Sequence, residues 1–316
     1  MMLALVAGDG PVRPLPAEEA AAYRGRGFVW IHLEGEDDLI AVHASDEAMP
    51  EVAAHALVAT ETRPRCDAVE QGAILNLRGL GAGDPAQADR LVSIRMWVRG
   101  SRVISASRHP MAATAVVRAK MEQGRIHDSG DLVAAYAWAI STQLDPEIAA
   151  LGDKLDDVES GLEPSHLYRL RRVITDVRSE AISFRRFVAP DRDALHTLPS
   201  LGFDWLAEDD RLHIVEAADR FARMAEELEA VRERAALLHE QITDLRAEQI
   251  DQRALYISIV AFIFLPLTFI TGLLGMNVEG IPYADHPSAF WAIVAFCVAT
   301  GTGVFGWFYW RHWINR

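Results

Sequence analysis

The chain has few cysteines and few basic residues, and each shortage narrows what the protein can be. Its 316 residues include two cysteines, Cys66 and Cys297, which form no Cys-x-x-Cys motif. A disulfide framework and a thiolate metal site are therefore excluded. Lys and Arg total 31 against 45 Asp and Glu, which gives a net charge of −14. General nucleic-acid binding needs a basic surface, so that class is excluded as well.

Charge is absent from two long segments near the end of the chain. Residues 255–274 and 289–310 contain no Asp, Glu, Lys or Arg, and each is long enough to cross a bilayer as a helix. Tyr and Trp residues gather at their ends, as they do at membrane interfaces. The charged residues after Arg253 cancel, so the whole −14 belongs to residues 1–254. The sequence therefore predicts an acidic soluble part joined to two membrane spans.

The arginines predict the orientation of the spans. Arg246 and Arg253 precede the first span, and Arg311 and Arg316 follow the second, whereas the connecting loop has no Lys or Arg. The positive-inside rule then places both termini in the cytoplasm and the loop outside. We predict a multi-pass protein of the bacterial inner (plasma) membrane whose acidic part is cytoplasmic.

The fold class predicted for the soluble part is α+β. Residues 1–108 read as a mixed α/β cytoplasmic domain, because short alternating apolar runs predict strands at 28–33, 73–77, 91–98 and 103–106. Residues 109–204 read as cytoplasmic helices. They include a helical hairpin that turns near 163–165, with an acidic first helix and an Arg-rich second helix.

The next segment predicts a very long helix. No Pro or Gly occurs from Arg211 to Leu265, and apolar residues recur at alternating spacings of three and four. One helix would then run from Arg211 to Leu274, with 205–254 as its cytoplasmic part and 255–275 as the first span. The external loop would be 276–288, the second span 289–310 and the cytoplasmic end 311–316. The alternative is a bundle helix followed by a separate span.

Two spans cannot enclose an aqueous channel, so ion conduction would require several copies, which the heptad seam of the long helix would assemble. Beside the seam lies a stripe of acids that would line a cation-concentrating vestibule: Glu226, Glu233, Glu240, Asp244 and Asp251. Its continuation into the span would line the pore, with Leu265 as a hydrophobic constriction: Ala254, Ser258, Ala261, Leu265 and Thr268. The alternatives are an ordinary solvated face and close helix packing by small residues.

A short motif follows the first span. Gly275-Met276-Asn277 is preceded by residues 264–272, which contain a Pro-Leu-Thr-Phe run, and together they resemble the CorA-type divalent metal ion transporters. The resemblance implies a homopentameric funnel whose five first spans line one pore, with Thr268, Leu265, Ala261 and Ser258 at pore-facing positions. It also implies that Asn277 rings the outer mouth and binds hydrated cation, that Gly275 lets the backbone turn, and that Met276 packs against that turn.

Within that family, residues 278–291 are similar to the ZntB-like zinc transport branch. Glu279, Asp285 and His286 would then capture metal at the external mouth, because carboxylate and imidazole are zinc ligands. The transported ion implied is Zn²⁺, taken up with possible proton coupling, and the alternative is a Mg²⁺, Co²⁺ or Ni²⁺ channel. The same metals are candidates for a regulatory role, and no catalytic cofactor is expected.

Two other functional classes are alternatives to a transporter. A non-conducting, membrane-tethered metal sensor would also suit acidic helices on a two-span anchor, although an anchor has no need of Asn277. An enzyme is disfavoured, because the eleven histidines are scattered and no nucleophile motif is present. The expected partners are further copies of the chain, the lipid bilayer and divalent cations.

Overall fold

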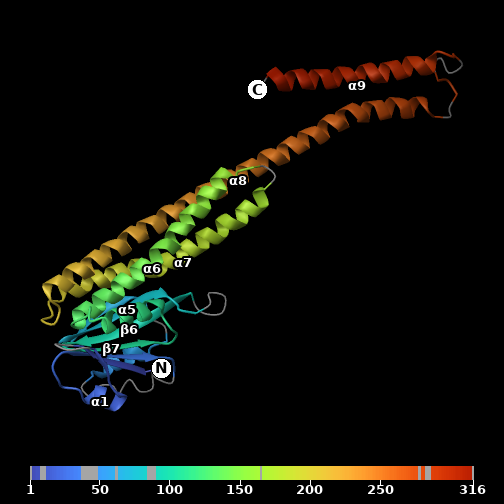
Figure 1. Ribbon diagram of the computed structural model, residues 1–316. Helices are drawn as coiled ribbons and strands as arrows, with labels where there is room; N and C mark the ends of the chain where they lie inside the picture. Colours follow the sequence, from blue (N-terminus) through green and yellow to red (C-terminus); the bar gives the residue numbers. More distant parts are fainter. Residues whose placement is uncertain are drawn as a thin grey trace. The chain divides into compact units, whose positions relative to one another are not determined.

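The computed structural model describes residues 2–7, 12–36, 49–60, 63–83, 90–163, 166–276, 279–281 and 286–314 (Figure 1). The chain divides into two units, Met1–His239 and Glu240–Arg316. The first unit holds a β-sheet and most of the helices, and the second holds the end of one very long helix and the C-terminal helix.

A seven-stranded mixed sheet forms the centre of the first unit. Its order is β2-β1-β3-β7-β6-β5-β4, and the pairing of β3 with β7 is parallel whereas the other pairs are antiparallel. The predicted strands are confirmed. Gly100 makes the turn between β6 and β7. Its φ of +57 lies in the region that favours glycine, so any other residue there would be strained. The strands are β1 (Met2–Ala7), β2 (Arg13–Pro14), β3 (Phe28–Glu34), β4 (Arg65–Val69), β5 (Gly72–Leu80), β6 (Leu91–Arg99) and β7 (Arg102–Ser107).

Helices cover both faces of this sheet, which is why its inner strands are buried nearly throughout, whereas the edge strands β2 and β4 are mostly exposed. On one face, Ile31 and Trp97 pack in a core with α1 (Ala17–Ala22) and α4 (Glu51–Val58). On the other face, Trp30 lies edge-on to Tyr136 of α6 (Ser129–Ser160), with ring centroids 6.0 Å apart. Neighbouring residues of β3 thus point to opposite layers, as strand geometry requires.

Three long helices lie side by side in this unit: α6, α7 (Leu167–Ser200) and the first part of α8 (Glu208–Leu274) (Figure 1). The shorter α5 (Ala112–Glu122) packs against α6. Arg234 of α8 pairs with acids of α6, and Arg185 of α7 lies 2.9 Å from Glu229 of α8. The predicted hairpin is confirmed, with its turn between Ser160 and Leu167.

The long helix is confirmed as one element of 67 residues. The apolar seam is buried within a single chain, with Ile214, Phe221, Leu228 and Leu238 each at most 2% exposed. Our expectation that this seam joins different copies is therefore wrong. The α6–α7 hairpin of the same chain supplies the apolar partner that the pattern demands.

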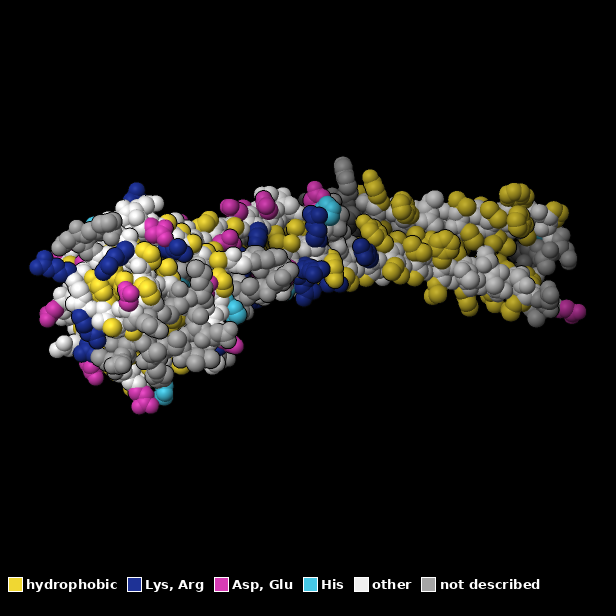
Figure 2. Space-filling view, turned by 60° about the horizontal axis from the view of Figure 1, so that its bottom comes forward, with side chains coloured by type: hydrophobic (Ala, Val, Ile, Leu, Met, Phe, Trp, Pro, Cys, Tyr) yellow, Lys and Arg dark blue, Asp and Glu magenta, His cyan; other side chains and the backbone are white. Residues whose placement is uncertain are grey.

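The second unit consists of the end of α8 and of α9 (Ala289–Ile314). Both contain a window apolar and long enough to cross a membrane, and neither window is buried. Figure 2 shows hydrophobic side chains covering this part of the chain. Because a soluble helix would hide such a surface, two membrane spans are its simplest explanation.

Candidate functional site

The long helix ends at the predicted motif. The N–H of Gly275 donates to the carbonyl oxygen of Thr271 over 2.9 Å, so the motif begins as a direct continuation of the last helical turn. Met276 is 46% exposed and does not pack into a core of this chain. Asn277 lies outside the described residues, and its role at the pore mouth stays a prediction.

The membrane part of α8 has two different faces. One face is half-buried against α9: Ile263 lies 3.8 Å from the position a Cβ would take on Gly301, and the rings of Phe262 and Phe308 meet edge-on at 6.3 Å. The half-buried positions recur every three or four residues, and they are Ile259, Ile263, Leu267, Ile270 and Leu274.

All five residues predicted to line a pore in this part of the helix lie on the opposite, exposed face. Leu265 is 76% exposed although it is a large apolar residue. We call this surface the open face of α8, and it consists of Ala254, Ser258, Ala261, Leu265, Thr268 and Gly272. Gly272 was missed by the sequence reasoning, although it continues the same spacing by one further turn and brings backbone to the surface just below the motif.

The predicted external residues are described only in part. Glu279 is exposed, and it precedes Gly280, whose φ of +101 marks a turn that favours glycine. His286 is also exposed, and its Nδ1 lies 3.1 Å from the hydroxyl of Ser288. Asp285 lies outside the described residues. The common role of the three predicted metal-capturing residues therefore stays a prediction.

The five acids of the predicted vestibule stripe are all exposed along α8: Glu226, Glu233, Glu240, Asp244 and Asp251. Among the described residues, none of them has an ion pair with a basic side chain. The seam beside them is buried, so the stripe faces away from the chain's own core. This arrangement leaves five carboxylates able to attract cations, which is the property that the prediction requires.

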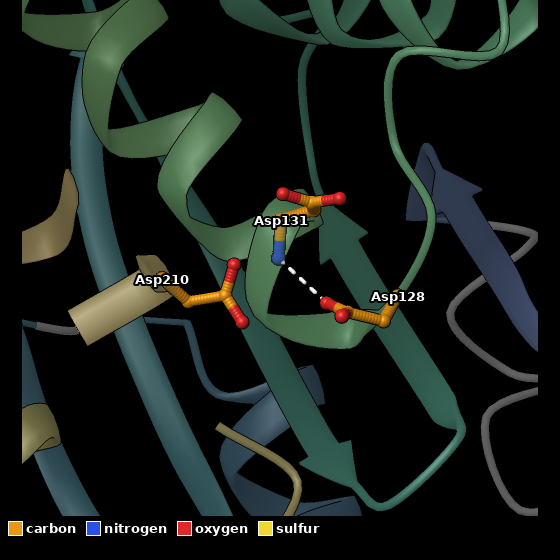
Figure 3. A group of neighbouring side chains, drawn as sticks. All are labelled: Asp128, Asp131 and Asp210. Atoms are coloured by element: carbon orange, nitrogen blue, oxygen red, sulfur yellow. Dashed lines mark hydrogen bonds between the residues drawn. The ribbon is translucent and has the colours of Figure 1, made fainter. Parts of the chain in front are cut away.

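A second acidic group was not predicted. Figure 3 shows that Asp210 in the first turn of α8 points toward Asp131 and Asp128 at the start of α6, and one oxygen from each lies within 4.8 Å of the others. Asp128 caps α6 by accepting from the N–H of Asp131, 2.9 Å away. The carboxylate of Asp210 is 3% exposed and accepts from the N–H of Ala207 over 3.2 Å.

Burial and the two neighbouring carboxylates raise the pKa of Asp210 to about 6. Oxygen donors of this kind suit a hard cation. The three carboxylates are also accounted for by helix capping and by the Ala207 contact, so we assign no ion to them. The sequence could have predicted only part of this group. Asp128 and Asp131 have the spacing of a helix cap, but nothing in the local sequence links them to Asp210.

Comparison with known proteins decides the family. The family model for the CorA-like Mg²⁺ transporter protein matches residues 25–311. The chain belongs to this CorA-like family. It is therefore a transporter of divalent cations and not an enzyme.

Individual relatives match along almost the full chain. The zinc transport protein ZntB of Pectobacterium atrosepticum is 28% identical over 309 residues, covering 97% of this chain and 94% of that protein. The divalent cation transporter CmaX of Pseudomonas aeruginosa is 31% identical over 287 residues, covering 90% and 86%.

Solved structures agree with the fold. Full-length CmaX has a TM-score of 0.78 at 28% identity and covers 98% of this chain and 97% of that one. The CorA magnesium transporter of Methanocaldococcus jannaschii has a TM-score of 0.80 at 16% identity, with 96% of both chains covered. The latter likeness concerns the fold alone. Together they support the predicted plan of an α/β domain, a long helix and two C-terminal spans.

Proposed function

We propose that this member of the CorA-like family carries Zn²⁺ into the cytoplasm through a pore formed by several copies of α8. The observation that carries the proposal is the open face. Apart from Leu265, it presents small, hydroxyl-bearing and backbone groups on the side away from α9, and it runs up to the motif at Gly275. A face of this kind would have no reason to exist in a two-helix anchor that conducts nothing.

The chemistry of the open face suits a hydrated ion. Ser258 and Thr268 offer hydroxyl oxygens, and Gly272 offers accessible backbone, but no carboxylate or imidazole lies on this face. A cation passing here would keep most of its water, since no strong ligand replaces the hydration shell. Leu265 would narrow the path, and an apolar ring of this kind closes a pore by excluding water.

Assembly follows from the same geometry. A single chain leaves the open face bare, so copies must place their open faces around a common axis. The resemblance to the CorA-type transporters supports five copies, in a homopentameric funnel. The vestibule stripe on the cytoplasmic part of α8 would then face that axis and raise the local cation concentration.

Zinc is proposed ahead of magnesium because of the relatives' names and of the residues beyond the motif. Glu279 and His286, both exposed, are of the types that zinc accepts as ligands, and Asp285 is the third candidate. The family model is named for Mg²⁺, which makes a magnesium channel the second candidate.

The same proposal places the protein in the inner membrane with both termini cytoplasmic. Arg246, Arg253 and Arg311 flank the spans on that side, and the loop between the spans has no basic residue. The acidic first unit would then lie in the cytoplasm, and the motif would stand at the outer end of the path.

Metal uptake by the purified protein in proteoliposomes tests this function. Wild-type protein should take up Zn²⁺, and Asn277→Ala should reduce the uptake rate about tenfold or more, which corresponds to about 1.4 kcal/mol. Asn315→Ala is the matched control, because it removes the same amide beyond the second span and should leave uptake unchanged. Equal uptake by wild type and Asn277→Ala would contradict the proposed site, and absence of any uptake by wild type would contradict transport.

Two further arms of the experiment refine the proposal. Competition by Mg²⁺, Co²⁺ and Ni²⁺ orders the ions, and stronger competition by Mg²⁺ than by unlabelled Zn²⁺ would favour the magnesium channel. An imposed pH gradient tests proton coupling, which requires the Zn²⁺ rate to change with the sign of the gradient. The mass of the detergent-extracted particle tests assembly, and a monomer would refute the pore.

A further inference from the structure

A cavity of about 730 Å³ opens in the first unit, in a part of the molecule that the conduction path does not use. Its walls come from four connections at one end of the sheet. They are the α1–β3 connection (23–25), the β4–β5 turn (70–71), the β6–β7 turn (99–102) and the α7–α8 connection (201–205). Its volume lies within the roughly 300–1,000 Å³ of small-molecule sites.

Two arginines hold these walls in place. Arg102 is 9% exposed, and its guanidinium donates to the carbonyl oxygens of Ala20 and Tyr23 at 3.1 and 2.9 Å. Arg211, which is half-buried, donates to the carbonyl oxygens of Phe203 and Leu206 at 2.9 and 3.1 Å. Each arginine fixes the backbone of one connection, so the cavity is built before any ligand arrives.

The cavity is rich in cationic side chains although the chain is acidic. Arg24, Arg99 and Arg102 line it, against two acids, Glu70 and Asp204. Arg99 is 3.8 Å from Glu70, a loose ion pair between partly exposed side chains. The Arg102 guanidinium is used in holding the wall, and one nitrogen of Arg24 donates to the carbonyl oxygens of Ala21 and Tyr23. Arg24 and Arg99 are therefore the guanidinium groups offered to a ligand. They favour an anion, and guanidinium is well matched to phosphate.

Part of the wall is aromatic. The rings of Phe203 and Trp205 stack with centroids 5.4 Å apart and an interplanar angle of 19°. The indole N–H of Trp205 is buried, and no acceptor for it is found among the described residues.

Space is also left where the connections turn. Gly100 and Gly202 have φ of +57 and +68, and a Cβ built on either would meet nothing within 4 Å. These two turns therefore stand open beside the arginines and the stacked rings. A side chain there would be strained, so the turns keep the approach to the cavity unobstructed.

We propose that this cavity binds a nucleoside phosphate. The phosphate would lie with Arg99 and Arg24, and the base would extend the Phe203–Trp205 stack. A simple inorganic anion would make no use of the aromatic wall, and an apolar ligand would make no use of the cationic side chains of Arg24 and Arg99. A nucleoside phosphate is the common class of metabolite that joins a strong anion to a flat ring with hydrogen-bond acceptors.

Isothermal titration of the purified full-length protein with ATP, AMP and inorganic phosphate tests the proposal. The buffer contains EDTA, so that metal held elsewhere cannot bridge to the nucleotide. Wild-type protein should bind ATP or AMP at least tenfold more tightly than phosphate, because the base adds a stacking contact that phosphate lacks. Arg99→Ala and Trp205→Ala should each weaken nucleotide binding about tenfold, whereas Trp205→Phe should stay within about threefold of wild type.

Arg118→Ala is the matched control, because Arg118 is a partly exposed arginine on α5 that pairs with Glu122 away from the cavity. It should bind nucleotide as wild type does. Unchanged melting temperatures would show that the variants are folded. If Trp205→Ala does not fold, Trp205→Phe and Arg99→Ala still test the proposal. The proposal is overturned if wild type binds no nucleotide at about 1 mM, if phosphate binds as tightly as AMP, or if Arg118→Ala weakens binding as much as Arg99→Ala.

Discussion

Replacing Asp210 with Asn should stabilise the protein at neutral pH, and the gain should shrink as the pH falls. The carboxylate is almost fully buried beside Asp128 and Asp131, and its pKa is raised from 3.8 to about 6. A raised folded-state pKa means that the protonated form is favoured by folding. The stability that Asp210 contributes is therefore present below about pH 4 and is lost as the pH rises through about 6.

The size of the effect follows from the shift. About two pKa units correspond to about 3 kcal/mol of cost at pH 7.5, of which about 1 kcal/mol remains at pH 4.5. Asn is nearly isosteric, its amide oxygen can still accept from the N–H of Ala207, and it carries no charge at either pH. For a unit of this size, 3 kcal/mol corresponds to roughly 6–12 °C in melting temperature.

Thermal unfolding of the full-length protein in detergent, followed at several pH values in the presence of EDTA, measures this difference. Asp209→Asn is the control, since it removes a neighbouring exposed charge from the same first turn of α8. Asp209→Asn should lose at most about 1 kcal/mol of folding stability, because it removes a negative charge that interacts favourably with the helix dipole, and this loss should depend little on pH. Parallel pH profiles for wild type and Asp210→Asn would show that the three carboxylates do not repel one another as the geometry requires.

Three other substitutions test the packing of the first unit. Gly72→Ala should destabilise this unit by about 2–4 kcal/mol in chemical unfolding. The new Cβ would lie 2.6 Å from the Trp97 ring and 2.7 Å from the carbonyl oxygen of Val98. A loss of stability below about 0.5 kcal/mol would contradict these contacts. Arg211→Met should cost about 2–3 kcal/mol by the same assay, since carbonyl oxygens of the α7–α8 connection lose their donor. Burial holds the pKa of Asp191 well above its ordinary value, so the stability that this side chain contributes should fall as the pH rises above the ordinary carboxyl range, and Asp191→Asn should flatten that dependence in the same assay.

Much of the fold was determined by local sequence. The absence of Pro and Gly from Arg211 to Leu265 determined the 67-residue α8, because nothing along that stretch interrupts a helix. Uncharged length determined the spans, and period-two alternation determined β3, β5 and β6. The motif at Gly275 and its upstream run identified the family, which the family model then confirmed.

The periodicity of α8 led to one wrong prediction, namely that its apolar seam joins different copies of the chain. The apolar seam of α8 reads the same whether its partner is another copy or another helix of the same chain, because burial gains the same free energy in both cases. The structure shows that the α6–α7 hairpin covers it. The sequence therefore predicted that the seam is buried, and it could not say by what.

The sequence by itself determined which elements form, which two segments can enter a bilayer and where the motif stands. Only the tertiary structure decided that Asp210 meets Asp128 and Asp131, that four distant connections enclose one cavity, and that Ile263 rather than Leu265 faces α9. Helices and strands are set by neighbours along the chain, whereas these contacts join residues far apart in sequence. In the membrane segment the spacing predicted the exposed face, but apolar residues occur all round the helix, so the sequence did not name the residues that pack against α9.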